Sequence, residues 1–232
     1  MTESADQSFF DPHQRATIDA AMARIVPSDD TPGAREAGAV DFVDRYLSGI
    51  GYIYAKADGS GFEQLTGRQA DAWRKRVDLA RRKYADGVVE LDRRARENHG
   101  SDFAELTPEQ QDDILRSLES PDRQEGAGAS RGERPITYGG PVEPALQQTN
   151  AESDLDFFPL LVTHTRQGWL SDPIYGGNRG QVGWKTIGFP GPSSLAEVHQ
   201  GRYSTLAYFA DDRNHPGQEA RSAAHATSTS ED

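Results

Sequence analysis

The sequence predicts a mainly α fold, an irregular helical domain that ends in a long glycine-rich loop. Three observations support this class. Apolar residues recur three and four positions apart through residues 69–98, as on one face of an α-helix. Asp11-Pro12 and Thr107-Pro108 are typical helix starts, with an N-cap residue followed by proline. The sequence contains no alternating β pattern of useful length and no internal repeat.

The first two helices are expected near the N-terminus. One begins at Asp11-Pro12 and ends before Pro27. Its apolar positions are Ile18, Met22 and Ile25. After a turn cluster, a second helix is expected to run from about Ala34 to the glycines at positions 49 and 51. The apolar positions of this helix are Val40, Val43 and Leu47, with Phe42 and Tyr46 beside them.

The clearest helix is expected over residues 69–98. Its apolar positions are Trp73, Val77, Ala80, Tyr84, Val88, Leu91 and Ala95. The Arg, Lys and Asp residues between them favour a solvated face with ion pairs over an anion-binding face. Phe103 and Leu106 are expected in the core, and Thr107 with Gln110 forms a capping box before a short helix. The apolar residues of the short helix are Ile114, Leu115 and Leu118.

Another helix is expected to begin at Ser153 and continue to Trp169. Its apolar residues lie on more than one side, which predicts burial from two directions. Pro159 is compatible with this helix only in the first turn or at a kink. A last short helix is expected from Ser193 or Ser194 to Gln200.

These elements predict a single helical domain over residues 9–210. Residues 120–150 form a Gly/Pro-rich insertion, because this stretch is longer than ordinary loops and poor in core-forming residues. It is expected to be disordered or to fold over something else. Residues 211–232 are expected to be a mobile acidic tail.

Composition excludes several classes of function. The 232-residue chain has a formal charge of -12, which disfavours nucleic acid as a partner. It has no cysteine, so disulfides, thiolate zinc sites, cysteine-ligated iron–sulfur clusters and covalent c-type haem are excluded. No apolar run has bilayer-spanning length. A hydrophobic fraction of only 35% indicates that part of the chain is unpacked or faces a partner.

The loop "DPIYGGNRGQVGWKTIGFPG", residues 172–191, is unlike the rest of the chain. A phosphate cradle is disfavoured, because such loops follow a strand and open a helix, whereas here a helix comes before. No nucleophile elbow or metal-binding spacing occurs, so no catalytic, cofactor-binding or metal-binding residue is predicted. His164 is expected to cap or bond a nearby backbone group. The pairs Asp29-Asp30 and Asp211-Asp212 are interpreted as turn and cap residues.

The same loop has the composition of an ordered, irregular surface. Asp172-Pro173 favours a turn, the glycines permit positive φ angles, and the aromatics are rigid anchors. Two roles stay open for each residue, namely packing within the chain and docking on another protein. The candidate partner-binding residues are Asp172, Tyr175, Gly176, Gly177, Asn178, Arg179, Trp184 and Phe189, with the apolar positions of residues 153–169 behind them.

This loop, preceded by "LLVTHTRQGW", resembles the C-terminal signature of the gluconate 2-dehydrogenase subunit 3 family, also called the gamma or small subunit. The segment "FDPHQRATIDAAMARIVPSDDTPGAREAGAVDFVDRYL" is similar to the opening of that family, and "DFAELTPEQQDDIL" matches a further segment. The resemblance covers about residues 9–120 and 153–192.

The resemblance implies a non-catalytic subunit without a cofactor of its own. Its partner is expected to be a large FAD-dependent flavoprotein of the glucose–methanol–choline type, with a cytochrome c or another electron acceptor. The complex would oxidise a sugar, a sugar acid or a glycoside. The chain lacks the twin-arginine leader of many members, which suggests a cytoplasmic complex unless a leader was removed or the partner carries one. The family does not explain the insertion at residues 120–150.

Two alternatives belong to other classes. One is a stand-alone carbohydrate-active enzyme with Asp172, His164 and Trp184 near a pocket, which predicts turnover by the isolated chain. The other is a folding chaperone that leaves once the flavoprotein has matured, which predicts that purified active enzyme lacks this chain.

Overall fold

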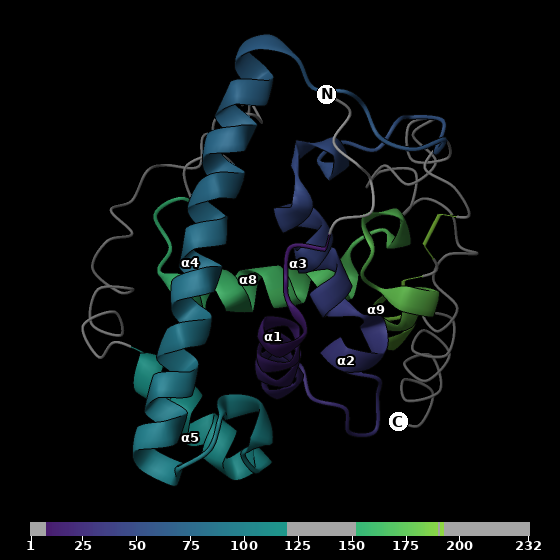
Figure 1. Ribbon diagram of the computed structural model, residues 1–232. Helices are drawn as coiled ribbons and strands as arrows, with labels where there is room; N and C mark the ends of the chain where they lie inside the picture. The colour runs from purple at the N-terminus through teal and green to yellow at the C-terminus, as the bar shows by residue number, and fades with distance from the viewer. Residues whose placement is uncertain (1–7, 120–151, 190, 193–232) are drawn as a thin grey trace, which may run out of the picture.

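Helix α4 (Gly67–His99) is the longest described element, and several of the other helices pack beside or across it (Figure 1). The computed structural model describes residues 8–119, 152–189 and 191–192. The remaining helices are α1 (Pro12–Ile25), α2 (Ala34–Ala37), α3 (Ala39–Ser48), α5 (Pro108–Leu118), α8 (Phe157–Leu170) and α9 (Val182–Thr186). Short 3-10 turns are η1 (Ile50–Tyr52), η2 (Phe103–Glu105), η3 (Pro173–Tyr175) and η4 (Arg179–Gln181).

The mainly α prediction is confirmed. Across the described residues the β pairing consists of one isolated bridge between Ala55 and Phe62. None of the helices in these ranges is both long and apolar enough to cross a membrane. The insertion at 120–150, the helix expected after Ser193 or Ser194, and the tail at 211–232 lie outside the described residues, so their structure stays a prediction.

The predicted helix starts at Asp11 and Thr107 are confirmed. The carboxylate of Asp11 accepts from the Gln14 N–H at 2.8 Å, and the Gln14 side chain accepts from the Asp11 N–H. Thr107 and Gln110 form the second capping box. These side chains satisfy N–H groups that have no partner within the helix.

The prediction of a single helix from about Ala34 to the glycines at positions 49 and 51 is wrong, because the structure divides this segment at Gly38. Gly38 has φ 67° and ψ 37°, the left-handed conformation that glycine adopts at low cost. It ends α2 and begins α3. The bend leaves the apolar positions of α3 where expected, since Val40, Val43 and Leu47 are all buried.

The helix expected from Ser153 begins later, at Phe157 with Asp156 as its N-cap. The physical reason is a cation from α4: Lys83 Nζ donates to the Ser153 carbonyl at 2.7 Å and to the Leu155 carbonyl at 2.6 Å. These bonds hold the segment before α8 in a turn. Pro159 then falls in the first helical turn, as its chemistry requires.

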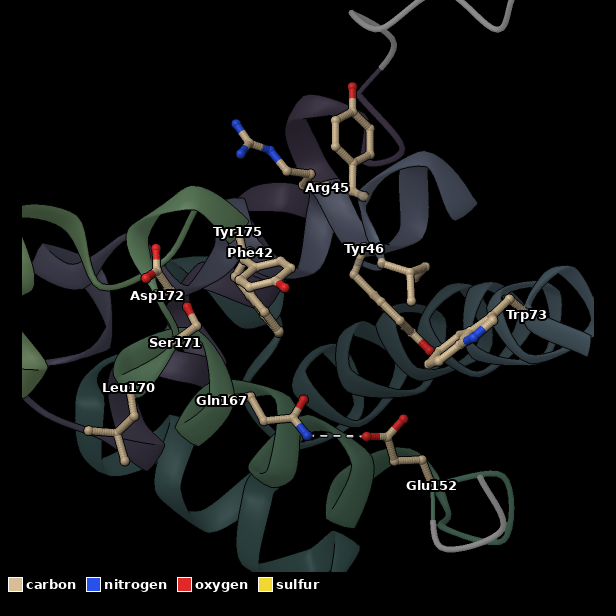
Figure 2. Close-up of a pocket in the computed structure, with 12 residues that line it drawn as sticks. Phe42, Arg45, Tyr46, Trp73, Glu152, Gln167, Leu170, Ser171, Asp172 and Tyr175 are labelled. Carbon is tan, nitrogen blue, oxygen red and sulfur yellow. Dashed lines mark hydrogen bonds between the residues drawn. The ribbon is translucent and has the colours of Figure 1, made fainter. Parts of the chain in front are cut away.

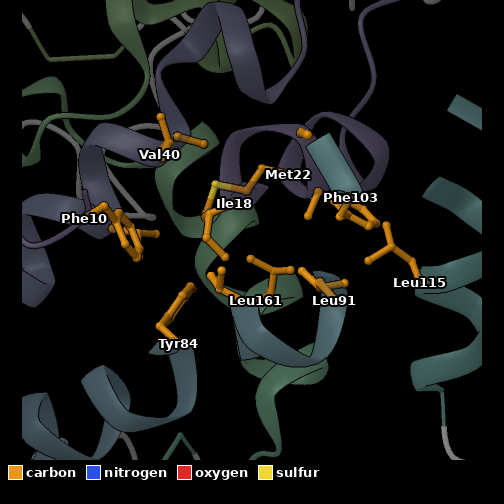
Figure 3. Close-up of a cluster of buried hydrophobic side chains, with 14 of the residues drawn as sticks. Phe10, Ile18, Met22, Val40, Tyr84, Leu91, Phe103, Leu115 and Leu161 are labelled. Atoms are coloured by element: carbon orange, nitrogen blue, oxygen red, sulfur yellow. The ribbon is translucent and has the colours of Figure 1, made fainter. Parts of the chain in front are cut away.

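Helix α8 lies at the centre of the packing and contacts α1, α2, α3, α4 and α9. Its burial from several sides confirms the prediction from its broad apolar band. Leu160 and Leu161 are almost fully buried within one apolar cluster (Figure 3). Other buried members of the cluster are Phe10, Ile18, Met22, Val40, Tyr84, Leu91, Phe103 and Leu115.

The charged face of α4 carries ion pairs, as predicted. Arg93 bonds both Glu90, at 2.8 Å, and Glu97, at 2.5 Å. Arg94 joins the same Glu90, and these hydrogen bonds lower the pKa of Glu90 to about 2. Such exposed pairs contribute little to stability individually, so the face serves mainly as a solvated surface.

One aspartate of α4 is buried instead. Asp92 is 3% exposed and its Oδ1 accepts from the Phe103 N–H at 3.0 Å. Its Oδ2 lies 2.7 Å from His13 Nε2 on α1. Asp92 therefore ties α1 and η2 to α4, and a buried carboxylate needs such partners because its ionised form is otherwise costly to desolvate.

The pairing of His13 with Asp92 predicts that the stability of the fold depends on pH. The hydrogen bond to Asp92 raises the pKa of His13, and the nearby charges of Asp92, Asp102 and Asp11 add to this. A raised folded-state pKa stabilises the fold below the ordinary histidine pKa of about 6.5, and this contribution is lost as pH rises through the raised value. The effect is expected to stay below about 1 kcal/mol, since the His13 side chain is 47% exposed.

Urea denaturation at pH steps from 5.5 to 8.5 measures this contribution. His13→Gln is expected to remove part of the fall in stability across that window. His99→Gln, at the exposed end of α4, is the matched control for the loss of an imidazole. Identical slopes for the parent chain and His13→Gln would contradict the assignment.

Candidate interaction site

The glycine-rich loop begins with the predicted turn. Asp172 Oδ1 accepts from the Ile174 N–H at 2.9 Å, and this bond starts η3. Gly176 follows with φ 101°. Tyr175 points away from the turn toward the strand-like segment before α4, where its hydroxyl accepts from the Ala55 N–H at 3.2 Å. The ring of Tyr175 also packs edge-on against Phe62, with ring centroids 5.7 Å apart.

Asn178 is fully buried, and its side chain holds the glycine-rich loop together by hydrogen bonds. Its amide nitrogen donates to the Ser171 carbonyl at 2.9 Å, and its amide oxygen accepts from the Gly183 N–H at 2.9 Å. Its own N–H donates to the Gly168 carbonyl at 2.8 Å. Asn178 adopts φ 47°, a conformation that asparagine tolerates better than most residues. The loop is therefore closed by one side chain that satisfies groups on both sides of it.

Gly177 lies where the loop passes over α8. A Cβ atom at this position would stand 2.1 Å from the carbonyl oxygen of Gly168. Since the obstacle is backbone, no side-chain movement can relieve it. The sequence suggested glycine here for positive φ angles, but the structure requires it for the close approach to α8.

Trp184 belongs to the interior of the chain. It is 6% exposed, and its indole N–H donates to the Leu170 carbonyl at 2.7 Å. Phe189 packs edge-on against it, with ring centroids 5.3 Å apart. These contacts close the loop onto the end of α8. For Asn178 and Trp184, packing within the chain is therefore the direct role, and any effect on a partner passes through the loop they support.

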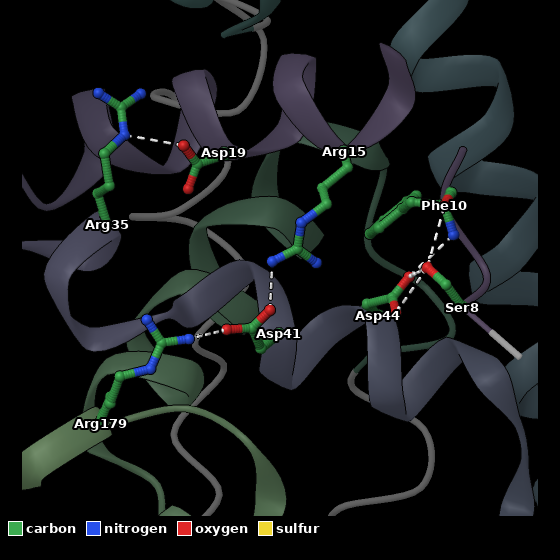
Figure 4. A network of polar contacts seen from close by, with 8 residues as sticks. All are labelled: Ser8, Phe10, Arg15, Asp19, Arg35, Asp41, Asp44 and Arg179. Carbon is green, nitrogen blue, oxygen red and sulfur yellow. Dashed lines mark hydrogen bonds and ion pairs between the residues drawn. The ribbon is translucent and has the colours of Figure 1, made fainter. Parts of the chain in front are cut away.

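Arginines join the loop to the N-terminal helices. Arg179 forms an ion pair with Asp41 of α3, and Arg15 of α1 pairs with the same carboxylate (Figure 4). Arg45 Nη1 donates to the Ile174 carbonyl at 2.7 Å. The Arg179 side chain remains 66% exposed, so it lies at the surface of the ordered loop.

A groove opens beside the loop, between the end of α8, the outer face of α3, η1 and the start of α4. Its volume is about 500 Å³. Aromatic rings and polar side chains share its lining (Figure 2). Of the predicted partner-binding residues, it includes Asp172 and Tyr175. The other lining residues were not predicted as partner-binding, although Phe42 and Tyr46 are large residues beside the buried face of their helix.

His164 has no access to this groove. It is 1% exposed and lies 3.0 Å by Nδ1 from the Tyr84 hydroxyl. Its ring stacks on Tyr84 and meets the edge of Tyr46, with centroids 5.8 Å and 5.2 Å away. Burial lowers the pKa of His164 to about 4, so the ring is neutral at pH 7. Its partner is thus a tyrosine hydroxyl, where the sequence suggested a backbone group.

The three residues considered for a stand-alone enzyme do not come together in the described part of the chain. Asp172 lines the groove, whereas His164 and Trp184 are buried elsewhere. Within the described ranges, no cluster of three or more His, Asp or Glu side chains could hold a metal ion. The arrangement offers contact surfaces and hydrogen-bonding groups.

Fold and site together define a small helical domain with an ordered C-terminal loop that its own side chains hold in place. The family model for gluconate 2-dehydrogenase subunit 3 matches residues 12–191 of the 232-residue chain. The chain therefore belongs to the gluconate 2-dehydrogenase subunit 3 family, as its loop and opening segments suggested. Searches of curated proteins and of solved structures found no match.

Proposed function

We propose that this chain is the non-catalytic small subunit of an FAD-dependent dehydrogenase that oxidises a sugar, a sugar acid or a glycoside. The family match over residues 12–191 carries the proposal, because it includes both the helical core and the complete glycine-rich loop. The flavin belongs to a large subunit of the glucose–methanol–choline type. This chain stabilises that subunit or assists its maturation.

The outer surface of the loop is the proposed contact with the flavoprotein. Arg179 is exposed there, and Ile187 is 57% exposed just after α9. Leu170, at the end of α8, is 38% exposed. An exposed aliphatic side chain on a rigid loop can anchor an interface when a partner covers it. Asn178, Gly177 and Trp184 support this surface from beneath.

Charge affects how fast the subunits meet. The chain carries a formal charge of -12, so a basic face on the flavoprotein or on a cytochrome c acceptor would be attracted to it. Association is expected to slow as salt concentration rises.

Co-expression with a flavoprotein subunit tests the proposal. The isolated chain should be colourless and show no turnover with sugars. With the flavoprotein it should purify as a yellow complex that oxidises a sugar. Constant stoichiometry in the active enzyme distinguishes a subunit from a chaperone that is released. Turnover by the isolated chain would contradict the proposal.

A pair of matched variants tests the contact surface. Ile187→Asp is expected to weaken the complex by about ten-fold or more, because it places a charge in a desolvated contact. Val89→Asp, on α4, is the control, since Val89 is also exposed, at 68%, and α4 lies on the opposite side of the molecule from α9 (Figure 1). Equal effects of the two substitutions would remove the loop from the interface.

A further inference from the structure

The groove beside the loop has two aromatic walls. In Figure 2, Tyr46 and Trp73 lie on one side of it, and Phe42 and Tyr175 on the other. The walls come from α3, α4 and η3, so three separate parts of the chain build them. The volume of about 500 Å³ lies within the usual range of small-molecule sites.

Other contacts within the chain hold both walls in place. Tyr46 and Trp73 pack against the same small apolar cluster of Ile50, Ala70 and Val77. Tyr175 is fixed by its bond to the Ala55 N–H at 3.2 Å. The groove is therefore formed before any ligand arrives, which lowers the cost of ordering on binding.

Polar groups occupy the space between the walls. Gln167 donates to Glu152 Oε1 at 3.1 Å, and its amide oxygen points toward the open groove (Figure 2). The side chains of Ser171 and Asp172 line the groove at the end of α8. Hydroxyl, amide and carboxylate groups in this setting can accept or donate hydrogen bonds to a ligand.

The charges of the groove are nearly balanced. Arg45 contributes a positive charge, and Glu152 and Asp172 contribute negative charges. Glu152 is in turn paired with Arg76 at 3.4 Å. A lining with balanced charges gives no advantage to an anion. A wholly apolar ligand would leave the polar groups of the groove without water or hydrogen-bond partners. These features favour a neutral ligand that has both apolar faces and hydroxyl groups.

From this combination we infer that the groove binds a neutral saccharide ring. The C–H face of a pyranose is weakly positive and packs against the negative face of an aromatic ring. Its hydroxyls lie around the edge, where the Gln167 amide, Ser171 and the carboxylates can bond them. This chain thus holds a carbohydrate-binding site of its own, outside any flavoprotein. The inference does not depend on the proposed flavoprotein partner.

Saturation-transfer NMR and calorimetric titration of the full chain test this site, without a flavoprotein present. The probes are methyl β-glucoside and cellobiose as neutral saccharides, gluconate as an anion, and cyclohexanol as an apolar ring. The neutral saccharides are expected to bind at least about five-fold more tightly than gluconate or cyclohexanol. The readout is binding, so it stays separate from any result on dehydrogenase assembly.

Variants connect the binding to the groove. Trp73→Ala is expected to weaken saccharide binding about ten-fold, through the loss of one stacking face. Gln167→Ala removes an exposed hydrogen-bonding group and should weaken binding several-fold without lowering the Tm. Trp169→Ala is the matched control, because Trp169 lies outside the groove and bonds the Pro32 carbonyl at 3.2 Å.

Three results would overturn the inference. The first is no saturation transfer to either neutral saccharide at tens of millimolar. The second is binding that survives unchanged in both Trp73→Ala and Gln167→Ala. The third is tighter binding of gluconate or cyclohexanol, which would assign the groove to an anion or to an apolar partner side chain. Because the Gln167 side chain is exposed, its variant keeps the test valid even if Trp73→Ala lowers stability.

Discussion

Replacing Gly177 by alanine is expected to lower the free energy of unfolding by about 2–4 kcal/mol. The new Cβ would stand 2.1 Å from the Gly168 carbonyl oxygen and 3.0 Å from its Cα, so α8 and the loop must separate. That separation would also strain the bond from the Asn178 N–H to the same carbonyl, now 2.8 Å. For a domain of this size, the expected fall in Tm is roughly 5–15 °C.

Gly51→Ala is the control for Gly177→Ala. No atom lies within 4 Å of a Cβ built at Gly51. This variant should change the free energy of unfolding by no more than about 0.5 kcal/mol. Thermal and urea unfolding of both variants measure the difference. If Gly177→Ala is as stable as Gly51→Ala, the loop does not lie against α8 as described.

The same substitution has a functional consequence under the proposed function. A loop displaced from α8 would lose the rigid surface that carries Arg179 and Ile187. Gly177→Ala is therefore expected to reduce co-purification with the flavoprotein well below that of the parent chain. A stable Gly177→Ala complex, in a chain shown to be destabilised, would indicate that the partner binds elsewhere.

Replacing Asp92 by alanine is the second substitution with a large expected effect. It should lower the free energy of unfolding by about 3 kcal/mol. It leaves the buried Phe103 N–H without its acceptor, now at 3.0 Å, and removes the partner of His13. An unsatisfied buried N–H costs about 1–3 kcal/mol, and hydrogen bonds to charged groups contribute about 1.5–3 kcal/mol. Phe103 itself is fully buried, so water cannot replace the lost carboxylate without disturbing the core.

Asp86→Ala is the matched control, because Asp86 lies on the same helix with its side chain exposed. Its expected effect is within about 0.5 kcal/mol of the parent chain. Unfolding at pH 6 and pH 8 adds a second readout, since Asp92→Ala should also remove the part of the pH dependence that comes from His13. An Asp92→Ala chain as stable as Asp86→Ala would show that this carboxylate does not hold α1 and η2 to α4.

The helices could be predicted well where the signal is local. Caps such as Asp11 and Thr107 bond groups three residues away, and the apolar spacing of α4 reflects one continuous buried face. Tertiary contacts overrode local signals at two places. Lys83, 70 residues before Ser153, draws the Ser153 carbonyl into a turn, and α2 and α3 separate at a single left-handed glycine.

The site was less predictable because its chemistry depends on distant contacts. Trp73 was predicted only as an apolar position of the long helix, and the structure places it in the lining of a groove together with Gln167 and Tyr175. Asp92 was interpreted as one more charge on a solvated face, although it is buried. The family signature correctly marked the loop as distinctive. It did not reveal that Asn178 is buried and holds the loop together by hydrogen bonds, while Arg179, the next residue, is exposed.

The central position of α8 has a consequence for how the chain matures on the ribosome. Its residues, beginning at Phe157, complete the packing between α1, α3 and α4. A nascent chain that has emerged only as far as α5 still exposes the apolar faces of α1, α3 and α4. These faces include Val43 and the residues that later pack against Leu161. Native contacts of such long sequence separation form late, so the domain closes only after α8 has been synthesised. Ribosome-bound intermediates should therefore recruit chaperones until α8 has left the exit tunnel.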